Sequence, residues 1–268
     1  MKQTFPDPNR LSVLTASVLL AYALARLIDP GRPALAWQIL GVAFSLPLNL
    51  SAAAAFLSAG MTAAGTDWLL RTHPNYDSAA SPEHWLLPAL TAFAIGIPLY
   101  TLPAGGGWWL SFGLGAVLFL LVLMAEYIAL DISDPRYLLA SAGLVALSFA
   151  LFLVLCAALE YANARLAFIL LTVFPAAALV ALRALHLRQG EWLWPWAIGI
   201  GLACAQIAAA LHYWPIAPAQ YGLAVLAPLY VLTDLGARVQ EQNSLRGATW
   251  QNALFLLLFW GAALFLRP

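Results

Sequence analysis

The sequence predicts an all-α protein, a polytopic transmembrane helical bundle of nine to ten spans that forms a single integral membrane domain over residues 1–268. Hydrophobic residues make up 63% of the chain and charged residues 9%, whereas a soluble domain carries about 25% charged residues. Apolar runs of about twenty residues, the length that crosses a bilayer, recur along the chain. The alternation of polar and apolar residues that is typical of membrane β-barrels is absent.

The first span is expected from Leu11 to Ile28, after the polar, turn-rich segment MKQTFPDPNR. A small-residue cleavage site does not follow it, so it reads as a retained span and not as a signal peptide. The next apolar run, Ala34 to Leu48, is short for a full crossing. It and the following helix form either two spans with a tight turn at Pro47–Leu50 or one long kinked helix. A continuous helix over 34–71 would overshoot the hydrocarbon, which favours two spans and a total of ten.

The stretch from Ser51 to Trp85 begins as a helix rich in small residues and ends in the densest group of ionisable side chains in the chain. Positions four apart share a helix face, and small residues on such a face let another helix approach closely in lipid. One face holds Ser51, Ala55, Ala59, Ala63, Asp67 and Arg71. The helix should end near Thr72, because Pro74 disfavours helical geometry at the residue before it.

Seven further spans complete the prediction, joined by short connections that leave no room for a soluble domain. Cys156 and Cys204 fall inside these apolar runs and are expected to pack as small hydrophobic residues. The predicted spans are Trp85–Leu102, Trp108–Leu130, Tyr137–Leu159, Leu166–Leu187, Trp192–His212, Gln220–Leu235 and Thr249–Leu266.

The distribution of lysine and arginine predicts the orientation in a bacterial-type inner membrane. With ten spans, eight of the twelve basic residues fall on one side, which is then cytoplasmic, and both termini lie outside. With nine spans, the N-terminus moves to the cytoplasm. The eight are Arg26, Arg32, Arg71, Arg136, Arg183, Arg188, Arg238 and Arg246; the other four are Lys2, Arg10, Arg165 and Arg267.

Two helix ends on the predicted cytoplasmic side share the pattern T-D-x-x-x-R, at Thr66–Arg71 and at Thr233–Arg238. In each, a carboxylate precedes a guanidinium by one turn, which is the favourable order for an ion pair. The pairs Asp67–Arg71 and Asp234–Arg238 either mark the membrane–water boundary or belong to a functional site. Two similar helix ends explain the recurrence better than an ancient duplication.

Glu126 is the deepest carboxylate in the predicted spans. A charge at that depth needs a partner or a proton, which makes Glu126 a candidate functional residue. The alternative is a structural role, in which Glu126 forms a hydrogen bond to a neighbouring helix. If Glu126 faces Arg71 or Arg238, one polar pocket between helices results. The candidate catalytic residues are therefore Glu126, Asp67 and Asp234, and the candidate substrate-binding residues are Arg71, Arg238 and His73.

No cofactor and no metal ion are expected. His186 and His212 are expected near opposite membrane faces, which argues against haem ligation between them. The only lysine, Lys2, lies outside any predicted span, which argues against a retinal Schiff base. Zero net charge and no basic tract make nucleic acid an improbable partner, so membrane lipid is the expected one. A solvated loop with no zinc-type spacing holds His73, Asp77, Glu83 and His84.

The run GTDWLLRTHP, from Gly65 to Pro74, resembles the signature of an uncharacterised family of bacterial multi-pass membrane proteins. The resemblance implies a membrane protein and carries no activity with it. The chain lacks the paired aspartate-rich motifs of membrane prenyltransferases, the motif of CDP-alcohol phosphotransferases and the paired glutamates of CAAX-type proteases.

Three functions stay open. The first is a polar pocket near the cytoplasmic face that binds or processes a lipid-like or amphiphilic small molecule, with the arginines on an anionic head group and a carboxylate holding a proton. The second is a small-molecule permease with Glu126 as coupling site, which Pro175 and Pro228 inside spans support. The third is a non-catalytic membrane subunit or scaffold.

Overall fold

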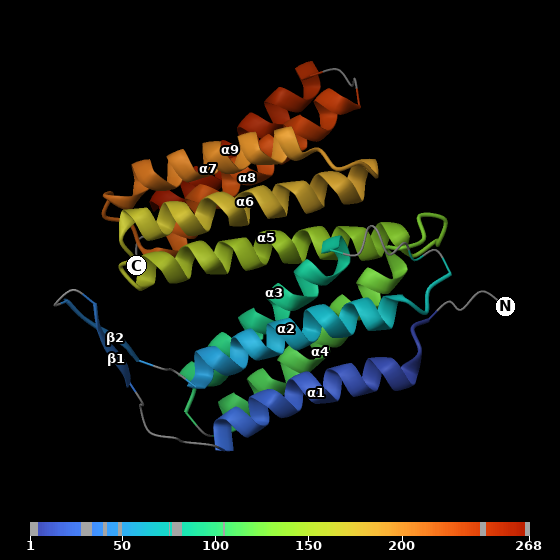
Figure 1. Ribbon diagram of the computed structural model, residues 1–268. Coiled ribbons are helices and arrows are strands. Elements are labelled where there is room, and N and C mark those ends of the chain that lie inside the picture. Colours follow the sequence, from blue (N-terminus) through green and yellow to red (C-terminus); the bar gives the residue numbers. More distant parts are fainter. Residues whose placement is uncertain are drawn as a thin grey trace. The chain divides into compact units, whose positions relative to one another are not determined.

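The computed structural model describes residues 5–27, 34–39, 42–47, 50–74, 76, 82–103, 105–241 and 245–265. The chain folds into two compact units, Met1–Ala140 and Ser141–Pro268 (Figure 1). The first contains α1 (Pro8–Leu27), β1 (Ala34–Ile39), β2 (Val42–Pro47), α2 (Leu50–Leu70), α3 (Pro82–Thr101) and α4 (Gly106–Ile128). The helix α5 (Tyr137–Tyr161) starts at the end of the first unit, and the second continues with α6 (Leu166–Gln189), α7 (Trp194–His212), α8 (Pro218–Gln240) and α9 (Leu245–Phe265).

The four helices of the first unit pack around one apolar core. The helix α2 lies between α1 and α3, and α4 packs against α3 and α1. Two hydrogen bonds from buried aromatic side chains fix these contacts: the Tyr22 hydroxyl donates to the carbonyl of Ala92, and Trp108 Nε1 donates to the carbonyl of Leu99 at 3.0 Å. Buried aromatic side chains normally satisfy their polar atom in this way.

The second unit is built on close contacts between α6, α7 and α8, with α9 against α8. Its core contains both cysteines, Cys156 and Cys204, each fully buried and unpaired, as their sequence context predicts. Glycine permits the close approach of α7 to α6, because a Cβ at Gly201 would lie 2.8 Å from the carbonyl oxygen of Phe174. Gly190 ends α6 in the left-handed conformation (φ 75°), which glycine adopts without steric cost.

The span predicted over Ala34–Leu48 is wrong. The strands β1 and β2 pair antiparallel in this segment, from Ala34 opposite Pro47 to Ile39 opposite Val42. An apolar run of this length is too short to cross a bilayer as a helix, and Pro47 removes a backbone donor at its end. A long kinked helix over 34–71 is excluded as well, because α2 begins at Leu50.

Six of the helices, α1 and α4–α8, are long and apolar enough to cross a membrane. Shorter apolar stretches lie in α3 (84–96) and α9 (250–263). The chain is therefore a helical protein of membrane type. The six helices coincide with predicted spans, whereas the predicted total of nine to ten exceeds the number that meet this criterion among the described residues.

The buried face of α2 is not the predicted small-residue face. The residues of this helix with no exposed surface include Ser58, Thr62 and Thr66, and the Thr62 hydroxyl donates to the carbonyl of Ser58 at 2.7 Å. On the predicted face, Ala55 is buried, whereas Ala59, Ala63 and Asp67 are only partly buried. Thr62 bonds within its own helix, whereas the hydroxyls of Ser58 and Thr66 have no hydrogen-bond partner among the described residues. Small side chains on this face let a neighbouring helix approach closely, which was expected of the alanines.

Candidate functional site

A buried carboxylate and a buried imidazole meet between α3 and α4. Glu126 has no exposed surface and His84 is 8% exposed, and His84 Nδ1 lies 3.1 Å from Glu126 Oε2. Glu126 faces inward because the spacing of three and four residues places it on one side of α4 with Phe119 and Leu123, both buried in the core. We call this contact the His84–Glu126 pair.

A second buried histidine, His73, lies next to Tyr127, the residue that follows Glu126 in α4. His73 is 8% exposed, and its ring meets the ring of Tyr127 edge to face at a centroid distance of 4.8 Å. The backbone N–H of His73 donates to the carbonyl of Leu70 at 2.8 Å, which ends α2 and directs the chain inward. Two histidines from other parts of the first unit therefore lie against the end of α4, His84 beside Glu126 and His73 beside Tyr127.

The predicted pair Asp67–Arg71 is present at the end of α2. Arg71 Nη2 lies 2.7 Å and Nε 2.9 Å from Asp67 Oδ2, and the Tyr76 hydroxyl also donates to this carboxylate. Bonding to Asp67 raises the pKa of the Arg71 guanidinium. The Arg71 side chain is 64% exposed, so this part of the predicted site is an ion pair at the surface of the unit.

The second predicted pair, Asp234–Arg238, belongs to a larger network that joins three helices of the second unit. Asp234 accepts hydrogen bonds from Arg238 Nε (2.7 Å), Arg188 Nη1 (3.0 Å) and Asn252 Nδ2 (2.9 Å). Arg188 Nε also donates to Glu241 at 2.6 Å. Asp234 thus ties α6, α8 and α9 together, a role that its T-D-x-x-x-R pattern alone did not predict.

The structure assigns Glu126, Asp67, Arg71 and His73 to the first unit and Asp234 and Arg238 to the second. The partner that it gives Glu126 is His84, which was predicted to lie in a solvated loop. That prediction is wrong because α3 starts at Pro82, ahead of the expected start at Trp85, and carries His84 in its first turn. Asp77, expected in the same loop, lies outside the described residues, as does the side chain of Glu83.

Sequence reasoning missed other polar residues that the structure places inside the helices. Arg183 is 4% exposed within α6, and Arg188 and Asn252 complete the network around Asp234. Arg183 stands inside an apolar run of the sequence, and an ionisable residue in such a run is by default a candidate functional residue. Within the described ranges, no group of three or more histidine, cysteine or acidic residues is arranged to hold a metal ion.

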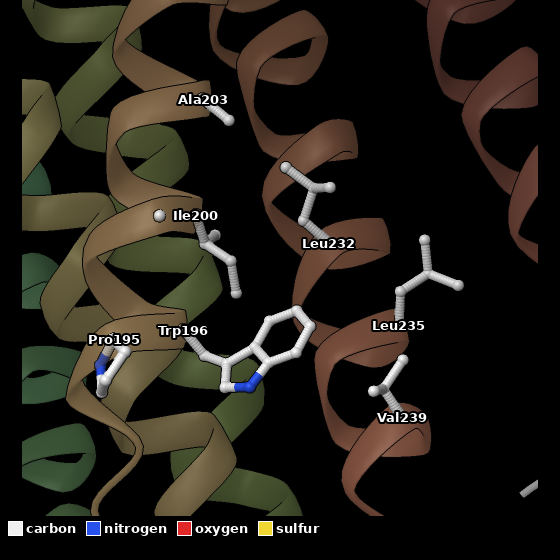
Figure 2. Close-up of a pocket in the computed structure, with 8 residues that line it drawn as sticks. Pro195, Trp196, Ile200, Ala203, Leu232, Leu235 and Val239 are labelled. Carbon is white, nitrogen blue, oxygen red and sulfur yellow. The ribbon is translucent and has the colours of Figure 1, made fainter. Parts of the chain in front are cut away.

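An apolar groove of about 540 Å³ lies on the second unit between α7 and α8. Figure 2 shows Trp196 and Ile200 of α7 facing Leu232, Leu235 and Val239 of α8 across it. Leu235 and Val239 directly follow Asp234 and Arg238 in the sequence, so the groove begins beside the charged network. The apolar groove and the charged side chains beside it match the two parts of an amphiphilic molecule, its apolar chain and its polar head group.

The comparisons with known proteins agree with the resemblance seen in the sequence. Neither a curated protein nor a solved structure matches the chain. One family model does match, over residues 30–266. It describes proteins of unknown function, so the uncharacterised family expected from residues 65–74 is confirmed. The chain belongs to this family of proteins of unknown function, DUF5656.

Proposed function

We propose that the protein is a proton-coupled permease for a small molecule in a bacterial inner membrane, and that the His84–Glu126 pair binds the coupling proton. One observation carries the proposal: a carboxylate without exposed surface lies 3.1 Å from a histidine nitrogen inside a helical bundle. Ionisable groups inside membrane spans are costly, and chains of Asp, Glu and His serve as proton relays in pumps and transporters.

The chemistry of the pair suits reversible protonation. A proton on Nδ1 of His84 lets the imidazole donate to Glu126, whereas a proton on Glu126 lets the carboxyl group donate to Nδ1. Burial disfavours a lone carboxylate, so a proton on either partner relieves the cost. The pair can therefore hold a proton on either partner while the hydrogen bond between Nδ1 and Oε2 is kept.

Two further features support a transporter over a scaffold. Pro175 lies inside α6 and Pro228 inside α8, and each lacks the N–H of a regular helical bond. Interrupted helices often line the binding sites of transporters. The buried Arg183 of α6 adds a charge that a purely structural span would not need.

The proposed topology has nine spans, α1 to α9, with the N-terminus in the cytoplasm. The open edges of β1 and β2 cannot lie in lipid, so the hairpin belongs outside the hydrocarbon. Arg10 Nη1 donates to the carbonyl of Trp68 at 2.7 Å, which puts the start of α1 at the same end as Asp67. This orientation keeps eight of the twelve basic residues inside, with Arg26, Arg32, Arg165 and Arg267 outside.

Single cysteines test this topology, in a chain from which Cys156 and Cys204 have been removed. We expect Asn163→Cys, in the turn after α5, to react with a membrane-impermeant maleimide added to intact cells. Ser133→Cys, in the turn before α5, should react only after the cells are opened. Labelling of both positions in intact cells would rule out a crossing by α5.

The permease proposal is tested in inside-out bacterial vesicles that are acidified by respiration. The probes are amphiphilic fluorescent dyes, for example ethidium, together with a panel of radiolabelled sugars and amino acids. We expect wild-type vesicles to move at least one probe in proportion to the pH gradient, and Glu126→Gln to abolish that movement. Asp67→Asn is the matched control and should retain it. If no probe moves, or if Glu126→Gln moves it equally well, the proposal fails.

A second candidate function rests on the groove of Figure 2. A lipid-like molecule could lay its chain against Trp196 and Leu235, with its anionic head group at Arg188 and Arg238. Gly199 has open space around it, so Gly199→Leu should fill the groove and reduce cross-linking of a photoactivatable fatty acid to α7 and α8. Equal cross-linking in both proteins would exclude this function.

A further inference from the structure

A second contact between a histidine and a glutamate lies in the second unit, at the C-terminal end of α7. Glu160 lies in the last turn of α5, and His212 is the last residue of α7. His212 Nδ1 and Glu160 Oε2 are 3.8 Å apart, and each side chain is 17% exposed. Both atoms are fully buried and have no hydrogen-bond partner among the residues that the structure describes.

A distance of 3.8 Å is too long for a hydrogen bond. If both groups lack a proton on these atoms, two buried acceptors face each other, and a buried acceptor without a partner is costly. When the imidazole takes up a proton, both ring nitrogens carry one, so Nδ1 donates to the carboxylate and the positive charge is compensated. Protonation of His212 would therefore satisfy both buried atoms of the contact.

Other titratable or charged side chains lie on the elements that carry or flank this contact. Cys156 of α5 is buried, and Tyr221 of α8 already donates its hydroxyl to the carbonyl of Ala208 at 3.1 Å. Tyr213 presents its ring to that of His212 at a centroid distance of 4.8 Å. Arg165, at the start of α6, is exposed to solvent.

We propose that Glu160 and His212 form a proton-binding site that fastens the end of α5 to the end of α7. Histidine is the side chain whose ordinary charge change falls in the physiological pH range, so the test compares pH values on either side of it. Proton uptake shortens the contact to hydrogen-bond length and stabilises the second unit. The site stands on its own geometry and does not depend on proton coupling at Glu126.

The first experiment is a double-mutant cycle in lipid nanodiscs with Glu160→Gln, His212→Gln and the double variant. Thermal unfolding is followed at about pH 5.5 and about pH 8.5, on either side of the titration range of imidazole. At the lower pH, we expect each single variant to unfold about 3 °C below the wild type and the double variant to lose little more. At the higher pH, these differences should shrink to less than half.

His186→Gln is the control, because His186 stacks on Trp192 at 3.9 Å in the same unit. It should leave the effect of Glu160→Gln at both pH values unchanged. A coupling between Glu160 and His212 that is absent, or equal at the two pH values, would overturn the proposal.

A second measurement covers the case in which a variant does not fold. Spin labels on Ala162→Cys and Trp214→Cys report the distance between the ends of α5 and α7 with Glu160 and His212 intact. The native cysteines are buried and should not be labelled. We expect the label distance to shorten, or its distribution to narrow, on acidification. An unchanged distribution contradicts the site.

Discussion

The Nδ1 atom of His84 lies 3.1 Å from the Oε2 atom of Glu126, and the two side chains come from different helices, α3 and α4. The contact gives the fully buried carboxylate of α4 an acid–base partner inside the first unit. In a contact of this kind, protonation of one group changes the ionisation of the other. Stability and protonation at this position should therefore change together.

Replacing His84 by Phe should lower the free energy of unfolding by about 1.5–3 kcal/mol, the usual contribution of a hydrogen bond to a charged group. Phe keeps an aromatic ring and removes both ring nitrogens, including the Nδ1 that faces Glu126. His73→Phe is the matched control, because the contact of His73 with Tyr127 is between rings. Denaturant unfolding in nanodiscs measures both variants. An equal loss in the two would show that packing, and not the bond to Glu126, accounts for the effect.

Asp234 should contribute more to stability than Asp67. Asp234→Asn weakens three hydrogen bonds, from Arg188, Arg238 and Asn252, and we expect it to cost about 1.5–3 kcal/mol. Asp67→Asn should cost less, because its partner Arg71 is 64% exposed and exposed ion pairs are screened by water. The test is the midpoint of unfolding of the two variants under the same conditions. The reverse order would contradict the assignment of Asp234 as the centre of a network.

The turn between α4 and α5 should weaken at low pH. Hydrogen bonds from the Arg136 side chain and backbone lower the pKa of Asp134 to about 2. The folded state therefore binds this proton less readily than the unfolded chain, whose pKa is near 4. The stabilisation is fully present above about pH 4 and is lost as the pH falls through about 2. Acid titration of tryptophan fluorescence should show a shallower loss of stability in Asp134→Asn than in the wild type, and identical slopes would disprove this contribution.

Two glycines of α7 should respond in opposite ways to the same substitution. A Cβ at Gly201 would lie 2.8 Å from a backbone oxygen of α6, whereas nothing lies within 4 Å of a Cβ at Gly199. Gly201→Ala should therefore cost about 1–3 kcal/mol through overpacking. Gly199→Ala should be neutral or stabilising by up to about 1 kcal/mol, since alanine favours the helix. A tolerated Gly201→Ala would show that α6 and α7 are not in the close contact that the structure gives.

Composition and run length predict the helices well, because burial in lipid requires long apolar segments whatever their partners. The run 34–48 was predicted as a span because its apolar content resembles one. Its two halves instead pair as β1 and β2, and hydropathy does not encode the register of that pairing. Local spacing predicted the ion pairs Asp67–Arg71 and Asp234–Arg238, because residues four apart on a helix meet.

Contacts between distant segments could not be predicted in the same way. His84 and Glu126 are 42 positions apart, and Arg188 reaches Asp234 across 46. Such pairs depend on how helices rotate and pack, which a single sequence specifies only through the sum of all side-chain contacts. The sequence thus pointed to Glu126 as a buried carboxylate that needs a partner, but it did not predict that His84 is the partner.

Infrared difference spectroscopy of the protein in nanodiscs tests the protonatable pair most directly, by following the stretching band of protonated carboxyl groups between about pH 8 and pH 5, the range of histidine chemistry. If the pair binds a proton, the wild type should gain or shift a carboxyl band that is missing in Glu126→Gln and displaced in His84→Phe. Asp134→Asn should leave this band unchanged, since Asp134 titrates at about 2. Identical spectra of the wild type and Glu126→Gln across this range would contradict a proton site at Glu126.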